Sequence, residues 1–167
     1  MNKILLSRIH ALGLAITLAA VFALAVALSA QYFGGLSPCA LCLVARWPYR
    51  IAIFAGVLAL VLPPRYAVAA LWFGLLCFVA DSAVAWVQIG VEMGWWKSPL
   101  AECSAPSLAG LSGARLLAAL PDRPVTPCDA PVYLIPGLKI SMAAMNLIYA
   151  VTGSFVLAKL LTYRKLS

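Results

Sequence analysis

Four long apolar segments dominate this sequence and restrict the folds that it can adopt. They cover residues 11–30, 43–62, 66–89 and 140–161. A helix of about 20 apolar residues crosses the hydrocarbon core of a bilayer. Of the 167 residues, 65% are hydrophobic and 10% are charged, which is far more apolar than soluble domains are. The sequence therefore predicts an all-α membrane protein, a bundle of four transmembrane helices that forms a single domain over residues 1–167.

The positions of the basic residues predict how these helices are oriented. Basic side chains lie before the first segment, in the short connection after the second, and at the end of the chain: Lys3, Arg8, Arg65, Lys159, Arg164 and Lys165. Cytoplasmic ends of membrane helices carry an excess of Lys and Arg. Both termini and the Arg65 turn are therefore expected in the cytoplasm. This placement explains the net charge of +7 without a nucleic-acid partner.

The first segment also has to be compared with a secretory signal peptide. It is longer than the apolar region of such a peptide, and Leu28 interrupts the small residues that a cleavage site near Ala30 requires. We therefore expect the segment to remain as a transmembrane helix.

Four of the five cysteines lie in two connections that are expected on the periplasmic side, where disulfides persist. Residues 31–42 include Cys39 and Cys42, and residues 91–139 include Cys103 and Cys128. Within the longer loop, residues 107–120 have a weak amphipathic pattern, which fits either a helix on the bilayer surface or an irregular loop. Cys77 lies inside the third apolar segment and is expected to be a small buried hydrophobic residue.

The Cys-x-x-Cys motif formed by Cys39 and Cys42 is the first candidate redox pair. Ser37 suits the N-cap position and Pro38 the first helical position, so both cysteines are expected in the first turn of the second helix. Helix N-termini and this cysteine spacing both favour the thiolate, which is the nucleophile in disulfide exchange. Residues three apart on a helix are also close enough to form a disulfide.

Arg46 follows Cys42 by four residues and is expected on the same face of the helix. Its permanent positive charge could stabilise the Cys42 thiolate, hydrogen-bond a quinone carbonyl, or do both. The alternative is an interfacial arginine whose head group extends to the membrane surface, which is what we expect of Arg50.

Aromatic residues near the outer ends of the helices are expected to form an interfacial belt, although those beside Cys42 could instead stack on a quinone ring. These residues are Tyr32, Phe33, Trp47, Tyr49, Trp86, Trp95 and Trp96. Asp81 is more unusual, because an ionisable residue inside a span is costly and normally faces the bundle interior or water. It is either a structural carboxylate with a partner or a residue that hydrates a quinone site or delivers protons.

Cys103 and Cys128 form the second candidate pair. Each has neighbours that favour turns, and from the residues alone their disulfide could be either redox-active or purely structural. A zinc site is disfavoured, because tetrahedral sites usually show two short-spaced pairs and here only Cys39 and Cys42 are closely spaced. No metal is expected.

Taken in order, these motifs resemble the DsbB family of disulfide bond formation proteins over nearly the whole chain. The matching stretches are residues 36–42 with 46–49, residues 90–92 with Trp96, Pro99 and Cys103, and residues 127–129 with 141–146. One departure is at Val87 and Gln88, where the resemblance implies a Tyr-His pair. Gln88 could still form a hydrogen bond there.

The resemblance implies a quinone-dependent thiol oxidase of the bacterial inner membrane. A periplasmic DsbA-like dithiol protein would attack the Cys103–Cys128 disulfide, with Cys103 in the mixed disulfide. Cys128 would exchange with Cys39, and Cys42 would contact a membrane quinone, ubiquinone or menaquinone, beside Arg46. All four cysteines would then be catalytic, and Cys42 and Arg46 would bind the quinone.

Two other interpretations remain open from the sequence. One is a quinone reductase like the vitamin K epoxide reductases, which the placement of the cysteines disfavours. The other is a non-enzymatic membrane protein with four spans, in which the outer cysteines form static structural disulfides.

Overall fold

The computed structural model describes residues 3–100, 103, 127–134, 137 and 140–162. The amphipathic pattern at residues 107–120 lies outside these ranges, as do Arg164 and Lys165. Within them the chain forms four helices, α1 (Lys3–Tyr32), α2 (Ala40–Val61), α3 (Pro64–Glu92) and α5 (Met142–Thr162). All four are long and apolar enough to cross a membrane. The predicted all-α fold with four membrane spans is therefore confirmed.

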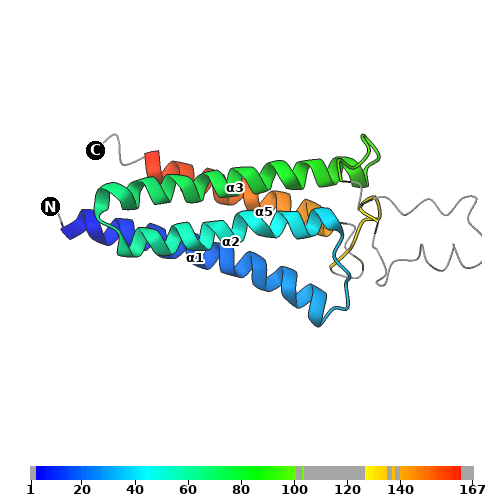
Figure 1. Ribbon diagram of the computed structural model, residues 1–167, viewed down its shortest axis with the longest axis horizontal. Coiled ribbons are helices and arrows are strands. Elements are labelled where there is room, and N and C mark those ends of the chain that lie inside the picture. The colour runs from blue at the N-terminus through cyan, green and yellow to red at the C-terminus, as the bar shows by residue number, and fades with distance from the viewer. Residues whose placement is uncertain (1–2, 101–102, 104–126, 135–136, 138–139, 163–167) are drawn as a thin grey trace, which may run out of the picture.

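The helices lie side by side along the long axis of the molecule (Figure 1). Helix α2 packs against α1 and α3, and α3 packs against α5. The beginning of α1, the α2–α3 turn and the end of α5 lie at one end of the bundle, whereas the α1–α2 connection and residues 127–134 lie at the other (Figure 1). The two cysteine-bearing connections therefore meet at the same end.

Small residues allow the helices to approach each other closely. A Cβ atom on Gly13 would lie 2.9 Å from the backbone oxygen of Gly56, and one on Gly56 would lie 2.8 Å from the backbone oxygen of Gly13. Close packing of this kind stabilises helix pairs in lipid, where no hydrophobic force drives helices together. The buried residues of the main core come from all four helices, for example Ile9, Ile16, Ala20, Ala52, Ala59, Ala67, Leu71, Phe78 and Leu157.

The beginning of α2 differs from the prediction. Ser37 and Pro38 precede the helix, which begins at Ala40, and Cys39 occupies the N-cap position with extended backbone. The Cys39 sulfur accepts a hydrogen bond from the backbone N–H of Cys42 over 3.3 Å, so it does what was expected of the Ser37 hydroxyl. The N-cap prediction at Ser37 was therefore wrong, but both cysteines do lie at the start of the helix.

The chain that leaves α3 is folded back onto that helix by Trp96. Its indole ring occupies the space where a side chain on Gly90 would lie, and its Nε1 donates a hydrogen bond to the backbone oxygen of Val87 over 3.1 Å. Any larger residue at position 90 would displace the ring. This contact gives a structural reason for the glycine and the tryptophan in the sequence motif that precedes Cys103.

Candidate functional site

Cys39 and Cys42 lie together at the N-terminus of α2. Their Sγ atoms are 2.7 Å apart, and both residues are free cysteines. Cys39 is buried, whereas Cys42 is partly exposed and lines a cavity. The hydrogen bond with Cys42, together with burial, raises the pKa of the Cys39 thiol. Of the two, Cys42 is therefore better suited to act as the thiolate.

Gln88 of α3 donates hydrogen bonds to both sulfur atoms. Its Nε2 lies 3.1 Å from Cys42 Sγ and 3.7 Å from Cys39 Sγ, and the side chain is buried. A donor of this kind stabilises a thiolate relative to a thiol. Because an amide does not titrate, the stabilisation does not depend on the protonation of Gln88. The sequence suggested that Gln88 could form a hydrogen bond, and in the structure it forms hydrogen bonds with the two cysteines of the pair.

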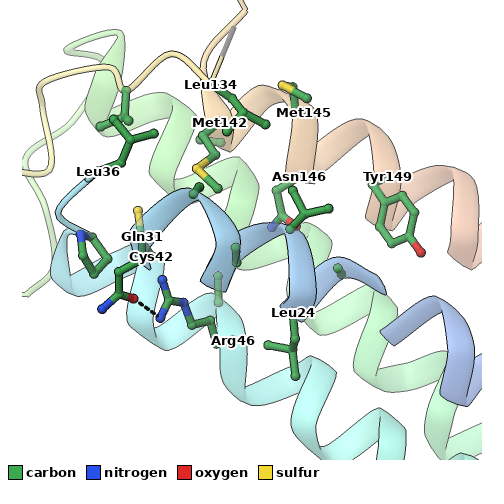
Figure 2. Close-up of a pocket in the computed structure, with 18 of the residues that line it drawn as sticks. Leu24, Gln31, Leu36, Cys42, Arg46, Leu134, Met142, Met145, Asn146 and Tyr149 are labelled. Carbon is green, nitrogen blue, oxygen red and sulfur yellow. Dashed lines mark hydrogen bonds between the residues drawn. The ribbon is translucent and has the colours of Figure 1, made fainter. Parts of the chain in front are cut away.

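Arg46 lies one helical turn after Cys42 and lines the same cavity. Its Nη1 donates a hydrogen bond of 2.7 Å to Oε1 of Gln31 on α1 (Figure 2). The Arg46 side chain is only 8% exposed, and its buried Nε has no partner among the described residues. Arg46 is therefore held inside the bundle, unlike Arg50, which is exposed and lies over the Trp47 ring.

The cavity beside Cys42 has a volume of about 360 Å³. This volume is within the range of small-molecule binding sites. Its wall is mainly apolar and includes Phe22, Leu24, Val26, Leu36, Leu134, Met142 and Met145. Its polar side chains include Cys42, Arg46 and Tyr49, which are spaced along one face of α2. The other helices contribute Gln31, Gln88, Asn146 and Tyr149. An apolar space with a few convergent polar groups suits a hydrophobic ring that carries oxygen atoms.

A chain of hydrogen bonds runs from this cavity across the bundle. The Tyr49 hydroxyl donates to Asn146 Oδ1 over 2.9 Å, and Asn146 Nδ2 donates to Asp81 Oδ2 over 2.9 Å. Asp81 is fully buried, and its Oδ1 has no partner among the described residues. Asp81 thus faces the bundle interior and has Asn146 as its partner. This agrees with the interpretation of Asp81 as a structural carboxylate with a partner.

Tyr49 corrects the prediction of an interfacial belt. It is only 4% exposed and lies inside the bundle, because its hydroxyl finds a partner on α5 and its ring packs edge-on against Phe78. The other aromatic residues of the predicted belt are exposed: Tyr32, Phe33, Trp47, Trp86, Trp95 and Trp96. Cys77 is buried in the core, as expected.

Cys103 and Cys128 form a disulfide bond. Both residues are buried, and they pack in one cluster with Cys39, against which Cys42 also packs. The structure thus brings together all four cysteines that the sequence singled out.

Two residues of the site were not assigned a role from the sequence, Gln31 and Asn146. Gln31 holds the Arg46 guanidinium, and Asn146 connects Tyr49 to Asp81. The signal that could have found them is a side-chain amide in or beside an apolar segment, since a polar group in a membrane span needs a partner.

Comparison with models of protein families gives a match that covers most of the chain. The family model described as "Disulfide bond formation protein DsbB" matches residues 9–160. No curated protein and no solved structure matches the chain. The family match covers α2 and α3 completely, most of α1 and α5, and the segments that carry the cysteine pairs. This chain therefore belongs to the DsbB family of disulfide bond formation proteins.

Proposed function

We propose that this protein oxidises a periplasmic DsbA-like dithiol protein and passes the electrons to a membrane quinone, either ubiquinone or menaquinone. The protein works as a single domain over residues 1–167 in the bacterial inner membrane, with both termini in the cytoplasm. The observation that carries this proposal is the convergence of Cys42, Arg46 and an apolar cavity at the end of the bundle where the four cysteines meet.

The relay begins at the Cys103–Cys128 disulfide. A thiolate of the partner attacks Cys103, forms a mixed disulfide and releases Cys128, which attacks Cys39 of an oxidised Cys39–Cys42 pair and releases the Cys42 thiolate. The second partner thiol then releases Cys103, which re-forms the disulfide with Cys128 and frees Cys39. The packing of Cys39 with both outer cysteines in one buried cluster supports this exchange.

A bound quinone supplies the acceptor for the two electrons and two protons that the Cys39 and Cys42 thiols lose when their disulfide re-forms. The cavity suits a quinone, because its wall is mainly apolar and the buried Arg46 Nε has an N–H without a partner among the described residues. Arg46 would hold a ring oxygen and stabilise negative charge that develops there. Gln88 would keep Cys42 reactive at the edge of the same cavity.

The proposal is tested by mixing the purified full-length protein in detergent with a reduced DsbA-like protein and a short-chain ubiquinone or menaquinone. We expect quinone absorbance to fall in proportion to the partner disulfide formed, one quinol for each disulfide. Omission of the partner protein is the control. If neither quinone is reduced while the cysteines resist a mild reductant, the outer disulfide is a static structural element and the proposal fails.

Replacing Arg46 by alanine is expected to slow quinone reduction by about ten- to a hundredfold, because a hydrogen bond to a charged group contributes about 1.5–3 kcal/mol. The measurement is the steady-state rate of quinone reduction across quinone concentrations. Arg50→Ala is the matched control, since Arg50 is on the same helix but is exposed and does not line the cavity. Equal rates for Arg46→Ala and wild type would exclude a role for the guanidinium.

Replacing Gln88 by methionine keeps a side chain of similar length but removes the donor to the Cys42 sulfur. We expect Cys42 to react about five- to tenfold more slowly with a thiol-alkylating reagent at neutral pH, as the loss of one hydrogen bond implies. The rate is followed by mass spectrometry in a Cys39→Ser background. An unchanged rate would mean that the amide does not stabilise the thiolate.

A further inference from the structure

The chain of hydrogen bonds from Tyr49 through Asn146 to Asp81 joins three helices and reaches the cavity at only one end. Tyr49 and Asn146 line the cavity, whereas Asp81 is fully buried behind them and is not part of the wall. The relay described above uses none of these residues. A buried carboxylate in a membrane span is costly, so its presence next to the ligand cavity requires an explanation.

With Asp81 ionised, the chemistry of the three groups fixes the direction of the hydrogen bonds between them. An ionised carboxylate only accepts hydrogen bonds, so the nitrogen of the Asn146 amide must face Asp81, as it does at 2.9 Å. The amide oxygen then faces Tyr49 and has no proton to give. The single hydroxyl proton of Tyr49 is then used inside this network, as the 2.9 Å hydrogen bond to Asn146 has it.

This arrangement determines what Tyr49 can offer to a ligand. Because its proton is already used, the hydroxyl oxygen can only accept a hydrogen bond from a molecule in the cavity. Farther along the same face of α2, toward its N-terminus, Arg46 can only donate. The cavity thus has a donor next to Cys42 and, one turn deeper along the helix, an acceptor.

We propose that Asp81, acting through Asn146, sets the Tyr49 hydroxyl as an acceptor that recognises the hydroxyl group of the reduced quinol ring. Asp81 and Asn146 are positioning residues, and Tyr49 makes the contact. A quinone carbonyl has no proton to donate to Tyr49, whereas a quinol hydroxyl does. The inference rests on the proposed function, because it assumes that a quinone binds in this cavity.

The Asp81→Asn variant allows the direction of the hydrogen bonds in this network to reverse without changing the shape of the side chain. An amide at position 81 can donate to Asn146, which can then turn its nitrogen toward Tyr49 and free the Tyr49 proton to face the cavity. We expect the Kd of quinol to rise about five- to tenfold and the Kd of quinone to stay the same or fall, as expected for the loss of one hydrogen bond to quinol. Tyr49→Phe should weaken quinol binding by a similar factor without strengthening quinone binding.

Binding is measured by tryptophan fluorescence, using a short-chain ubiquinone and its quinol with the detergent-purified full-length protein. Cys39 and Cys42 are both replaced by serine, so that neither ring form reacts. Ser82→Ala is the matched control, because Ser82 is adjacent to Asp81 on α3 but its hydroxyl donates to Phe78 within the same helix. We expect this control to bind both ring forms as the parent protein does.

The outcomes separate this inference from the proposed function. If the Kd values of quinone and quinol rise by the same factor in Asp81→Asn, the network only holds the helices together and the inference is overturned. An unchanged quinol Kd in Tyr49→Phe overturns it as well. If the folded parent protein and its Ser82→Ala control bind neither quinone nor quinol, the cavity is not a quinone site. The proposed function then fails together with the inference.

Discussion

Replacing Cys42 by serine is expected to reduce quinone reduction by a factor of about 1,000 or more, the scale of loss when an enzyme loses its nucleophile. Cys42 is the only one of the four outer cysteines that lines the cavity. A serine hydroxyl at this position cannot form a disulfide with Cys39, so the electrons have no route to the acceptor. The measurement is the fall in quinone absorbance with a reduced DsbA-like protein as the donor.

Cys77→Ser is the matched control for this experiment. Cys77 is also a free cysteine, but it is buried in the main core of the bundle and does not line the cavity. Its replacement should leave turnover unchanged. The Cys42→Ser protein should still form a mixed disulfide with the partner through Cys103, visible on a non-reducing gel, which would show that it is folded. Full turnover in Cys42→Ser would remove Cys42 from the mechanism.

The sequence predicted the parts of this protein that depend on local pattern. Apolar segments of about 20 residues specify membrane helices irrespective of their neighbours, because lipid requires every backbone group to be satisfied within the helix. The spacing of Cys39, Cys42 and Arg46 is also local, since residues three and four apart share a helix face. All three do lie at the start of α2, where Cys42 and Arg46 line the cavity and Cys39 is buried beside Cys42.

The sequence did not predict the contacts between helices, because they depend on how the helices rotate and slide against one another. Gln31 and Arg46 come from different helices, and nothing in their spacing pairs them. Tyr49 shows the consequence most clearly. Its position near a helix end suggested the membrane interface, yet the rotation of α2 turns it inward to Asn146, 97 positions later in the chain.

The start of α2 was predicted incorrectly for a different reason. Ser37 is a common N-cap residue and Pro38 a common first residue of a helix, so their statistical preferences favoured a start at this point. The helix begins at Ala40 instead, because the sulfur of Cys39 accepts the N–H of Cys42. General preferences did not anticipate a cap formed by a cysteine side chain.

The spacing of the cysteines in the sequence also did not predict that the two pairs lie close together. Two membrane helices, α2 and α3, separate Cys39 from both Cys103 and Cys128 in the sequence, so no linear pattern places these cysteines together. In the structure they share one buried cluster with Cys39. This proximity allows the relay, but a purely structural disulfide could occupy the same position. An experiment that removes one pair and keeps the other distinguishes the relay from a structural disulfide.

Replacing Cys103 and Cys128 together by serine is that experiment. We expect turnover with the DsbA-like protein to fall by a factor of about 100 or more, since a protein thiol then lacks the disulfide that it attacks. Turnover with dithiothreitol as the donor should persist, because a small dithiol can enter the cavity and reduce the Cys39–Cys42 pair directly at the partly exposed Cys42. The double replacement leaves neither Cys103 nor Cys128 as a lone thiol that could form an unrelated mixed disulfide.

The comparison of the two donors decides between the roles of the outer disulfide. If it is a redox relay, the protein donor fails and the small donor succeeds in the same sample, which excludes unfolding as the cause. If the bond is a static element, its loss affects both donors alike, through the roughly 2–4 kcal/mol of stability that a disulfide contributes. If turnover with the protein donor is fully retained, the partner attacks the Cys39–Cys42 pair directly, and the proposed order of exchange is wrong.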